Sequence, residues 1–217
     1  MNVIEAIWPL WIIWLLAGGV ITGLLCGMLS SPDENTQKIV ILGSSGAGKT
    51  TLWDKLRGKI SHTSYYQTNQ ESVDSFSITV AGKTVRIPKT RDIGGNDFAV
   101  QYYKDLINED GTFIYFLVDL TKLDVTEREI RARLQVISKI LKDKKLEKCG
   151  FKILATHFDE YSRKKSTRPE DAVAEVQKCL SNIKNCSIKI DIDHIMAVDL
   201  TNGYYVDKIK KEIVLEK

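Results

Sequence analysis

The sequence predicts an α/β fold, with a mostly parallel six-stranded sheet, helices on both faces and one transmembrane helix before it. Three observations lead to this prediction. Short apolar runs alternate with helix-like segments from residue 38 to residue 217. A glycine-rich loop separates the first apolar run from the first of these helices. An uncharged stretch, residues 7–29, precedes both.

The uncharged stretch is expected to anchor the chain in a membrane. About 20 helical residues span a bilayer core, and residues 7–29 are mostly apolar and long enough. Trp8, Trp11 and Trp14 fit an aromatic belt at the membrane interface. A cleaved signal peptide is disfavoured, because no Lys or Arg precedes the stretch and no small-residue cleavage site follows it. The predicted parts of the chain are an anchor over 1–30, a linker over 31–37 and a domain over 38–217.

Positive charge orients the predicted anchor. No Lys or Arg precedes Lys38, so the cations near the span lie only on its C-terminal side. The positive-inside rule then places the domain in the cytoplasm of a single-pass membrane protein.

The anchor also contains a repeated glycine. Gly19, Gly23 and Gly27 recur every fourth residue, a spacing that lets two membrane helices pack closely. Two interpretations stay open: pairing of transmembrane helices through this face, or the ordinary glycine content of a membrane helix.

Six runs are expected to form the sheet. Residues 113–119 and 151–155 are almost wholly apolar, which is typical of central parallel strands buried on both faces. Two further runs flank Ala81-Gly82-Lys83 and are expected to pair as a hairpin at the edge. The predicted strands are 39–42, 75–80, 84–88, 113–119, 151–155 and 195–198.

Helix-like segments lie between these strands. Thr126-x-x-Glu129 and Thr167-x-x-Glu170 read as capping boxes and predict where two helices begin, the second with Pro169 in its first turn. The predicted helices are 51–56, 98–108, 126–142, 169–183 and 204–214.

The glycine-rich loop predicts phosphate binding. Residues 43–50, GSSGAGKT, match G-x-x-x-x-G-K-[ST] between a predicted strand and a predicted helix. In this setting backbone N–H groups hold a phosphate chain, Lys49 reaches its terminal phosphates and the Thr50 hydroxyl binds Mg²⁺. Lys49 is therefore also a candidate catalytic residue. The candidate phosphate-binding residues are Gly43, Ser44, Ser45, Gly46, Ala47, Gly48, Lys49, Thr50 and Thr51.

A second motif narrows the class of nucleotide-binding protein. Residues 91–97, RDIGGND, contain D-x-x-G directly after the predicted hairpin. In a GTPase such an Asp, here Asp92, acts on Mg²⁺ through water, and the N–H of the glycine, here Gly95, contacts the γ-phosphate. An ABC ATPase is disfavoured because no LSGGQ-like sequence and no acidic residue directly after Asp119 are present. A nucleotide kinase is disfavoured because no arginine-rich lid stands out.

These motifs resemble the Arf/Sar branch of Ras-like small GTPases, which includes the β subunit of the signal-recognition-particle receptor. DIGGN at 92–96 is similar to the branch's D-V-G-G-Q, and FLVDL at 116–120 is similar to its F-V-V-D-S. The resemblance covers nearly all of 38–217 and implies a Ras-like P-loop NTPase fold with GTP or GDP and Mg²⁺ as ligands. The receptor subunit also carries a membrane span before its GTPase domain. Arf has a myristoylated glycine where this chain has Asn2.

The resemblance also implies residues that act on the γ-phosphate. Thr68 stands about where the family keeps the switch threonine that closes on Mg²⁺, with Thr63 as the second choice. Asn96 stands where the family has the glutamine that orients the attacking water. Its side chain is one methylene shorter, and a misplacement of about 1 Å can cost about 10²-fold in rate. We therefore expect intrinsic hydrolysis at or below roughly 10⁻⁴ s⁻¹, the scale of an unaided small GTPase, with an activating protein needed for more.

Base recognition is implied by a further match. Thr156-His157-Phe158-Asp159 stands in the place of the family's N-K-x-D. Asp159 would accept hydrogen bonds from guanine N1–H and its 2-amino group, which adenine does not offer. Thr156 replaces the Asn, and His157 replaces a Lys that packs along the base and ties to the phosphate loop. Ala197 marks the region of a backbone contact to the base.

Three functional classes stay open. The first is a membrane-anchored switch that binds and slowly hydrolyses GTP and recruits an effector through residues near Thr68 and 93–103. The second is a scaffold that keeps its GTP with little turnover. The third is an ATP-dependent P-loop enzyme.

Charge and cysteine content restrict the partners. The chain has a formal net charge of +3, and its basic runs lack the interleaved aromatic residues that would favour nucleic acid. In a reducing cytoplasm the four cysteines are expected to be free thiols.

Overall fold

The structure, a computed structural model, describes residues 35–60 and 70–215. The chain divides into two units, Met1–Glu34 and Asn35–Lys217, and the described residues belong to the second. Throughout these ranges, no helix combines the length and the apolar character that crossing a membrane requires. Several predictions concern residues outside these ranges: the span 7–29 with Gly19, Gly23 and Gly27, and the switch threonines Thr63 and Thr68.

Part of the predicted linker is bound to the domain. The Gln37 N–H donates to the Arg86 carbonyl at 2.9 Å, and the Arg86 N–H donates to the Asn35 carbonyl at 2.9 Å. Thr36 forms a bridge with the same residue. Residues 35–37 of the predicted linker therefore contact β4 (Lys83–Ile87) and belong to the same unit as the domain.

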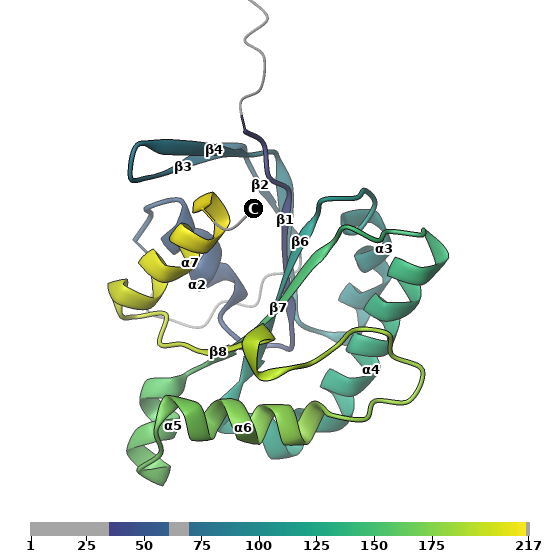
Figure 1. The fold of residues 1–217 in the computed structure, drawn as a ribbon, viewed down its shortest axis with the longest axis vertical. Coiled ribbons are helices and arrows are strands. Elements are labelled where there is room, and N and C mark those ends of the chain that lie inside the picture. Colours follow the sequence, from purple (N-terminus) through teal and green to yellow (C-terminus); the bar gives the residue numbers. More distant parts are fainter. Residues whose placement is uncertain (1–34, 61–69, 216–217) are drawn as a thin grey trace, which may run out of the picture. The chain divides into compact units, whose positions relative to one another are not determined.

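The centre of the domain is a four-stranded parallel sheet (Figure 1). Its strands are β1 (Ile39–Gly43), β6 (Phe113–Asp119), β7 (Gly150–Thr156) and β8 (Ile195–Ala197), in the order β1-β6-β7-β8. Their register aligns Gly43 with Leu117 and Asp119 with Thr156. The carboxyl ends of these strands therefore share one edge of the sheet, the usual place for a ligand in such a fold.

The predicted hairpin forms, but it lies outside this sheet. β3 (Phe76–Val80) pairs with β4 (Lys83–Ile87), and two unpredicted strands, β2 (Gln70–Val73) and β5 (Thr90–Ile93), pair with each other. Pro88 follows β4 and lacks the N–H that a ladder needs, so it separates the two pairs. The prediction of one six-stranded sheet is therefore wrong. The described strands form one sheet of four strands and two separate sheets of two strands each.

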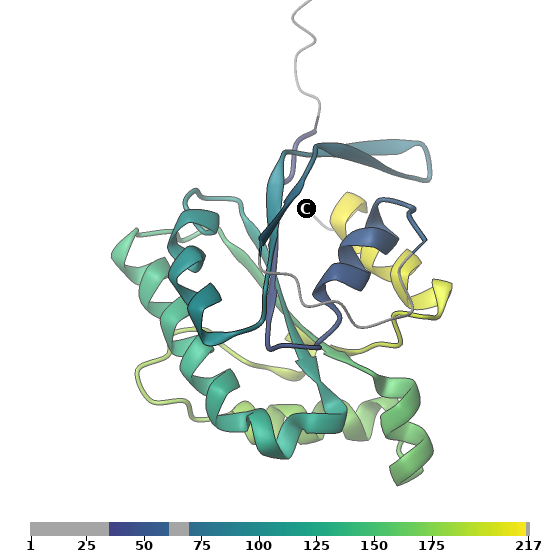
Figure 2. The ribbon, with the colours of Figure 1, turned by 180° about the vertical axis from the view of Figure 1, so that it is seen from behind.

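Helices cover both faces of the central sheet, as Figures 1 and 2 show from opposite sides. Ile39 and Ile41 of β1 pack in one core with α2 (Lys49–Leu56) and α7 (Gly203–Leu215). Val40 and Leu42 pack in the other with side chains of four helices. Those four helices are α3 (Tyr103–Leu106), α4 (Leu123–Asp143), α5 (Phe158–Lys165) and α6 (Pro169–Leu180). Alternate side chains of β1 therefore pack into the two cores, so this strand is buried on both faces.

Both predicted capping boxes are wrong. α4 begins at Leu123, so Thr126 lies inside it and its hydroxyl donates to the Lys122 carbonyl at 2.8 Å. Glu129 pairs with Arg133 instead of closing a cap. α6 begins at Pro169 as predicted, but its N-cap is Arg168, which makes no side-chain cap bond.

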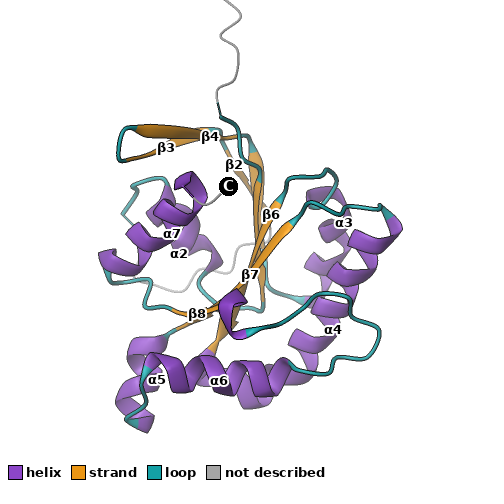
Figure 3. Cartoon of the chain, viewed as in Figure 1, coloured by secondary structure: helices purple, strands orange, loops and turns teal. Residues whose placement is uncertain are grey.

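Shorter helical segments complete the domain (Figure 3). The predicted helix 98–108 is a 3₁₀ helix, η2 (Asp97–Tyr102), followed by α3. Two further 3₁₀ turns, η3 (Leu120–Lys122) and η4 (Ile192–His194), precede α4 and β8.

Candidate phosphate-binding site

The glycine-rich loop joins the carboxyl end of β1 to the amino end of α2. It starts at Gly43, the last residue of β1, and ends at Lys49, the first residue of α2. Gly48 precedes the helix and has a φ of 87°, a left-handed backbone conformation that residues other than glycine rarely adopt. A Cβ at Gly48 would also lie 2.9 Å from a methyl carbon of Leu200. The backbone conformation therefore favours glycine at this point of the loop, and the Leu200 side chain would have to shift to admit a Cβ.

The other predicted residues of the loop lie at different depths. Ser44 and Ala47 are buried, Gly46 and Thr51 are half-buried, and Ser45 is exposed. The buried Ser44 hydroxyl has no hydrogen-bond partner within the described residues. A donor buried without a partner is costly, so it fits a site that a polar ligand completes.

Lys49 is the buried cation of the loop. Its Nζ donates to the Ser44 carbonyl at 2.9 Å, and its exposed fraction is 6%. Burial lowers the pKa of Lys49 to about 8, against the opposing pull of the Asp92 carboxylate. The Asp92 carboxylate does not offset the loss of hydration of the buried ammonium. The site therefore favours binding of a polyanion such as a phosphate chain.

Thr50 and Asp92 form a pair suited to a divalent cation. The Thr50 hydroxyl donates to Asp92 Oδ2 at 2.6 Å. The second carboxylate oxygen, Oδ1, is buried without a hydrogen-bond partner among the described residues, and burial raises the pKa of Asp92. Oxygen donors of this kind fit Mg²⁺, which is usually held by one or two protein ligands, waters and phosphate oxygens. No cluster of three His, Cys, Asp or Glu side chains suited to a metal occurs within 35–60 and 70–215.

The D-x-x-G glycine lies directly against the phosphate loop. A Cβ on Gly95 would be 2.2 Å from the Ser45 nitrogen and 2.3 Å from the Ser44 carbonyl carbon. Only glycine therefore fits there. The adjacent Asn96 Oδ1 accepts the Ala99 N–H at 3.0 Å and caps η2. The side chain expected to orient water is engaged as a helix cap.

Thr156 and His157 hold the back of the phosphate loop. The buried Thr156 hydroxyl lies 3.1 Å from both the Ala47 and the Val118 carbonyl. His157 has φ 57°, and its Nε2 lies 3.1 Å from the Gly46 carbonyl. Because a carbonyl only accepts, this nitrogen carries the proton. His157 thus makes the tie to the loop that was expected of the Lys it replaces.

Asp159 and Ala197 are the two other residues predicted to contact the base. Asp159 is in the first turn of α5, where its carboxylate is 3.2 Å from Arg163 Nη2 and 40% exposed. Ala197 ends β8 and is buried. Leu200, which the sequence did not single out, approaches Gly48 from the loop after β8.

Arg133 on α4 is a second residue that the sequence motifs did not identify. Its Nη2 donates to the Gly95 carbonyl at 2.8 Å, next to the phosphate loop. Ile130, Leu134 and Ile137 mark the buried stripe of the same helix. In the sequence, Arg133 falls among these apolar positions of the helix, and a charged residue on an apolar helix face is the signal that identifies such a buried cation.

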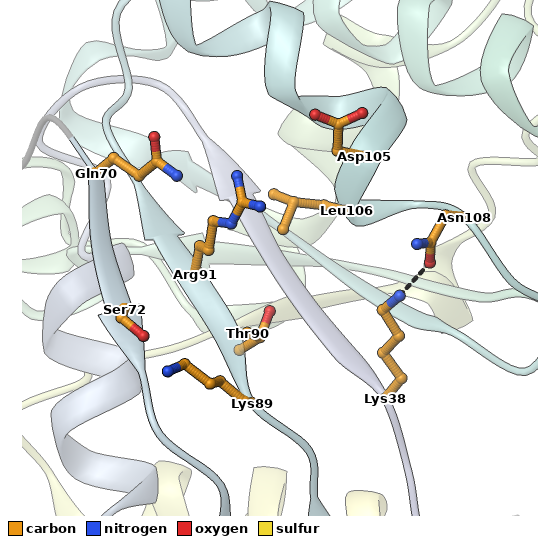
Figure 4. A pocket seen from close by; sticks show the side chains of 9 residues that line it. All are labelled: Lys38, Gln70, Ser72, Lys89, Thr90, Arg91, Asp105, Leu106 and Asn108. Carbon is orange, nitrogen blue, oxygen red and sulfur yellow. Dashed lines mark hydrogen bonds between the residues drawn. The ribbon is translucent and has the colours of Figure 1, made fainter.

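A separate hollow of about 570 Å³ lies between β2, β5 and α3 (Figure 4). Lys38, Lys89 and Arg91 line it together with Asp105, and Lys38 donates to Asn108 across it. None of the predicted nucleotide-binding residues that the structure describes lines this hollow. This hollow is therefore separate from the predicted phosphate-binding residues.

A model of the ADP-ribosylation factor family matches residues 25–209, a range that includes every candidate site residue. A search of curated proteins found no match.

Proposed function

Because the chain belongs to the ADP-ribosylation factor family, we propose that it is a switch held at the cytoplasmic face of a membrane, where bound GTP recruits a partner. Membership makes the chain a small GTP-binding protein of a GTPase family. The strongest support from the site is the meeting of Lys49, the Thr50–Asp92 pair and Gly95 at one sheet edge.

GTP or GDP with Mg²⁺ would occupy this edge. Lys49 would bind the terminal phosphates, and Thr50 with Asp92 would hold the metal, joined by Thr68 in the GTP state. Mg²⁺ would neutralise charge that develops on the phosphates during hydrolysis. The Gly95 N–H would contact the γ-phosphate, which only GTP carries.

Guanine would be read by the segment after β7. Asp159 would exchange its exposed contact with Arg163 for the two N–H groups of guanine. A carboxylate aimed at these groups rejects adenine, because adenine would leave it unmatched. Thr156 and His157 would keep this segment and the phosphate loop in register.

Slow hydrolysis is proposed from the state of Asn96. Its side chain is short, and its oxygen is already occupied by the Ala99 N–H. To orient a water molecule it would have to leave the cap, so an activating protein would be needed for rapid turnover. The same observation favours a second candidate, a scaffold that keeps its GTP.

Membrane attachment and partner binding complete the proposal. Residues 7–29 would span the membrane, and the Gly19, Gly23 and Gly27 face would pair transmembrane helices. An effector would bind near Thr68 and 93–103, where Phe98 is 79% exposed. An effector bound there would cover this exposed side chain.

Nucleotide content tests this proposal. The full chain is purified in detergent without added nucleotide, and its ligand and turnover are measured. Bound GDP that exchanges for GTP supports the switch, and retained GTP supports the scaffold. Binding of ATP in place of guanine nucleotides would refute the proposal.

A further inference from the structure

Arg133 is a buried cation between α4 and the D-x-x-G segment. Its side chain is 2% exposed, although it lies in a helix with many solvent-facing positions. A buried charge is retained only when it is paired and hydrogen-bonded. The contacts of Arg133 therefore indicate what holds it there.

The guanidinium contacts two residues of the segment, which lie on either side of Asn96. Nη2 donates to the Gly95 carbonyl at 2.8 Å and lies 3.3 Å from Asp97 Oδ1. Asp97 is 93% exposed, so solvent screens that second contact. The bond to the buried Gly95 carbonyl is the stronger restraint on the segment.

Two further groups fix the guanidinium itself. Glu129 Oε1, one helical turn before Arg133, lies 2.8 Å from Nη2 and balances its charge as an ion pair, although neither this oxygen nor Arg133 Nε makes a hydrogen bond within the described residues. Nη1 donates to the Tyr103 hydroxyl at 3.1 Å, and Tyr103 is fully buried. Arg133 is thus held by α3 and by its own helix while it binds Gly95.

Gly95 is consequently confined on two sides. The Ser44–Ser45 peptide of the phosphate loop lies so close that no Cβ fits. Arg133 binds the carbonyl of the same residue. Gly95 therefore cannot move from its place at the phosphate loop without disturbing the Arg133 contact.

We propose that Arg133 is a positioning residue for γ-phosphate recognition, holding Gly95 against the phosphate loop so that the site distinguishes GTP from GDP. This inference rests on the proposed function, because it assumes that Gly95 meets the γ-phosphate. The charge of Arg133 also acts on Lys49, whose pKa it helps to lower, so its field reaches the phosphate site.

The test compares two arginines of the same helix. Arg133→Met removes the contact to Gly95. Arg131→Met is the matched control, because Arg131 also pairs with a glutamate one turn before it, Glu127 at 2.8 Å, and donates to a backbone carbonyl, that of Cys179 in α6. Dissociation constants for GDP and a slowly hydrolysed GTP analogue are measured with Mg²⁺ on the full chain in detergent.

Arg133→Met is expected to lower the preference for the GTP analogue over GDP by about tenfold, the scale of one charge-assisted hydrogen bond. Arg131→Met is expected to leave that ratio unchanged. Equal weakening of both nucleotides by Arg133→Met, or a ratio within twofold of wild type, would overturn the inference. A wild-type chain that binds no guanine nucleotide would instead overturn the proposed function, and the inference with it.

Tyr103→Phe provides a second test if Arg133→Met does not fold. This change removes only the hydroxyl that accepts from Arg133 and keeps the ring in the core. A smaller shift in the same direction, about threefold, is expected because one of the groups that fix the guanidinium is lost. An unchanged ratio in this variant would also overturn the inference.

Discussion

His157→Ala is expected to weaken GDP and GTP by the same factor. The imidazole Nε2 lies 3.1 Å from the Gly46 carbonyl, so it supports the phosphate loop from behind. In the proposed complex the loop would contact phosphates that both nucleotides share, whereas the γ-phosphate would meet the separate segment 93–97. Loss of the imidazole should therefore leave the preference between GTP and GDP unchanged.

The size of this effect follows from one hydrogen bond. A bond of this kind contributes about 0.5–1.5 kcal/mol net, which corresponds to a factor of about two to about ten in the dissociation constant. The His157 side chain is 39% exposed, and Asp119 Oδ2 lies 3.9 Å from the same nitrogen. Partial exposure places the expected effect in the lower half of that range, near threefold.

Displacement of a fluorescent GDP from the full chain measures both constants. His157→Lys serves as the matched variant, because an ammonium can also donate to the Gly46 carbonyl, and it should recover most of the affinity. A thermal denaturation scan shows whether each variant is folded. An unchanged dissociation constant for His157→Ala, or a loss confined to GTP, would refute the supporting role.

Four further predictions follow, two on pH, one on the D-x-x-G glycine and one on turnover. Lys49 loses its proton near pH 8 when folded but near pH 10.5 when unfolded, so the nucleotide-free domain should gain stability as pH rises through this interval; denaturant titrations that show a loss would contradict this. GDP affinity should fall as pH rises above about 8, because phosphates need the ammonium, and a flat profile in binding titrations would exclude Lys49 as the main contact. Gly95→Ala should reduce GTP affinity by at least about tenfold and GDP affinity less, because the new methyl would lie 2.2 Å from the Ser45 nitrogen; equal affinities for the variant and wild type would be inconsistent with the close contact. The purified chain should hydrolyse GTP at or below roughly 10⁻⁴ s⁻¹, and single-turnover rates faster than about one per minute would exclude Asn96 as a limiting residue.

The elements that the sequence predicts well are those with a strong periodic or apolar signal. β6 is an apolar run that is buried except at Phe113, β7 is buried from Ile153 to Thr156, and the loop 43–50 has a fixed pattern of glycines. β2, by contrast, reads Gln-Glu-Ser-Val and is mostly exposed, so no hydrophobic pattern marks it. α5 consists largely of charged residues and buries only Phe158 and Tyr161, too few for a visible stripe.

The predicted start of α4 is wrong for a different reason. A capping box is only a pattern of residue types. The Thr126 hydroxyl instead donates a hydrogen bond to a backbone carbonyl one turn earlier, so Thr126 is accommodated inside α4. At the site, the place of Lys49 and Thr50 was predictable because the motif fixes their spacing. The contacts of Arg133 and Leu200 were not, because they join segments that are distant in sequence.

The contacts of Thr156 and His157 with the phosphate loop affect the expected rate of nucleotide association. A peptide's C=O and N–H point in opposite directions, so holding the Gly46 and Ala47 carbonyls from behind also fixes the N–H groups of Ala47 and Gly48. Ordering a residue costs about 1–2 kcal/mol of conformational entropy, and here folding rather than binding meets that cost. A nucleotide then meets a rigid receptor, and association should be limited by diffusion and not by reshaping of the loop.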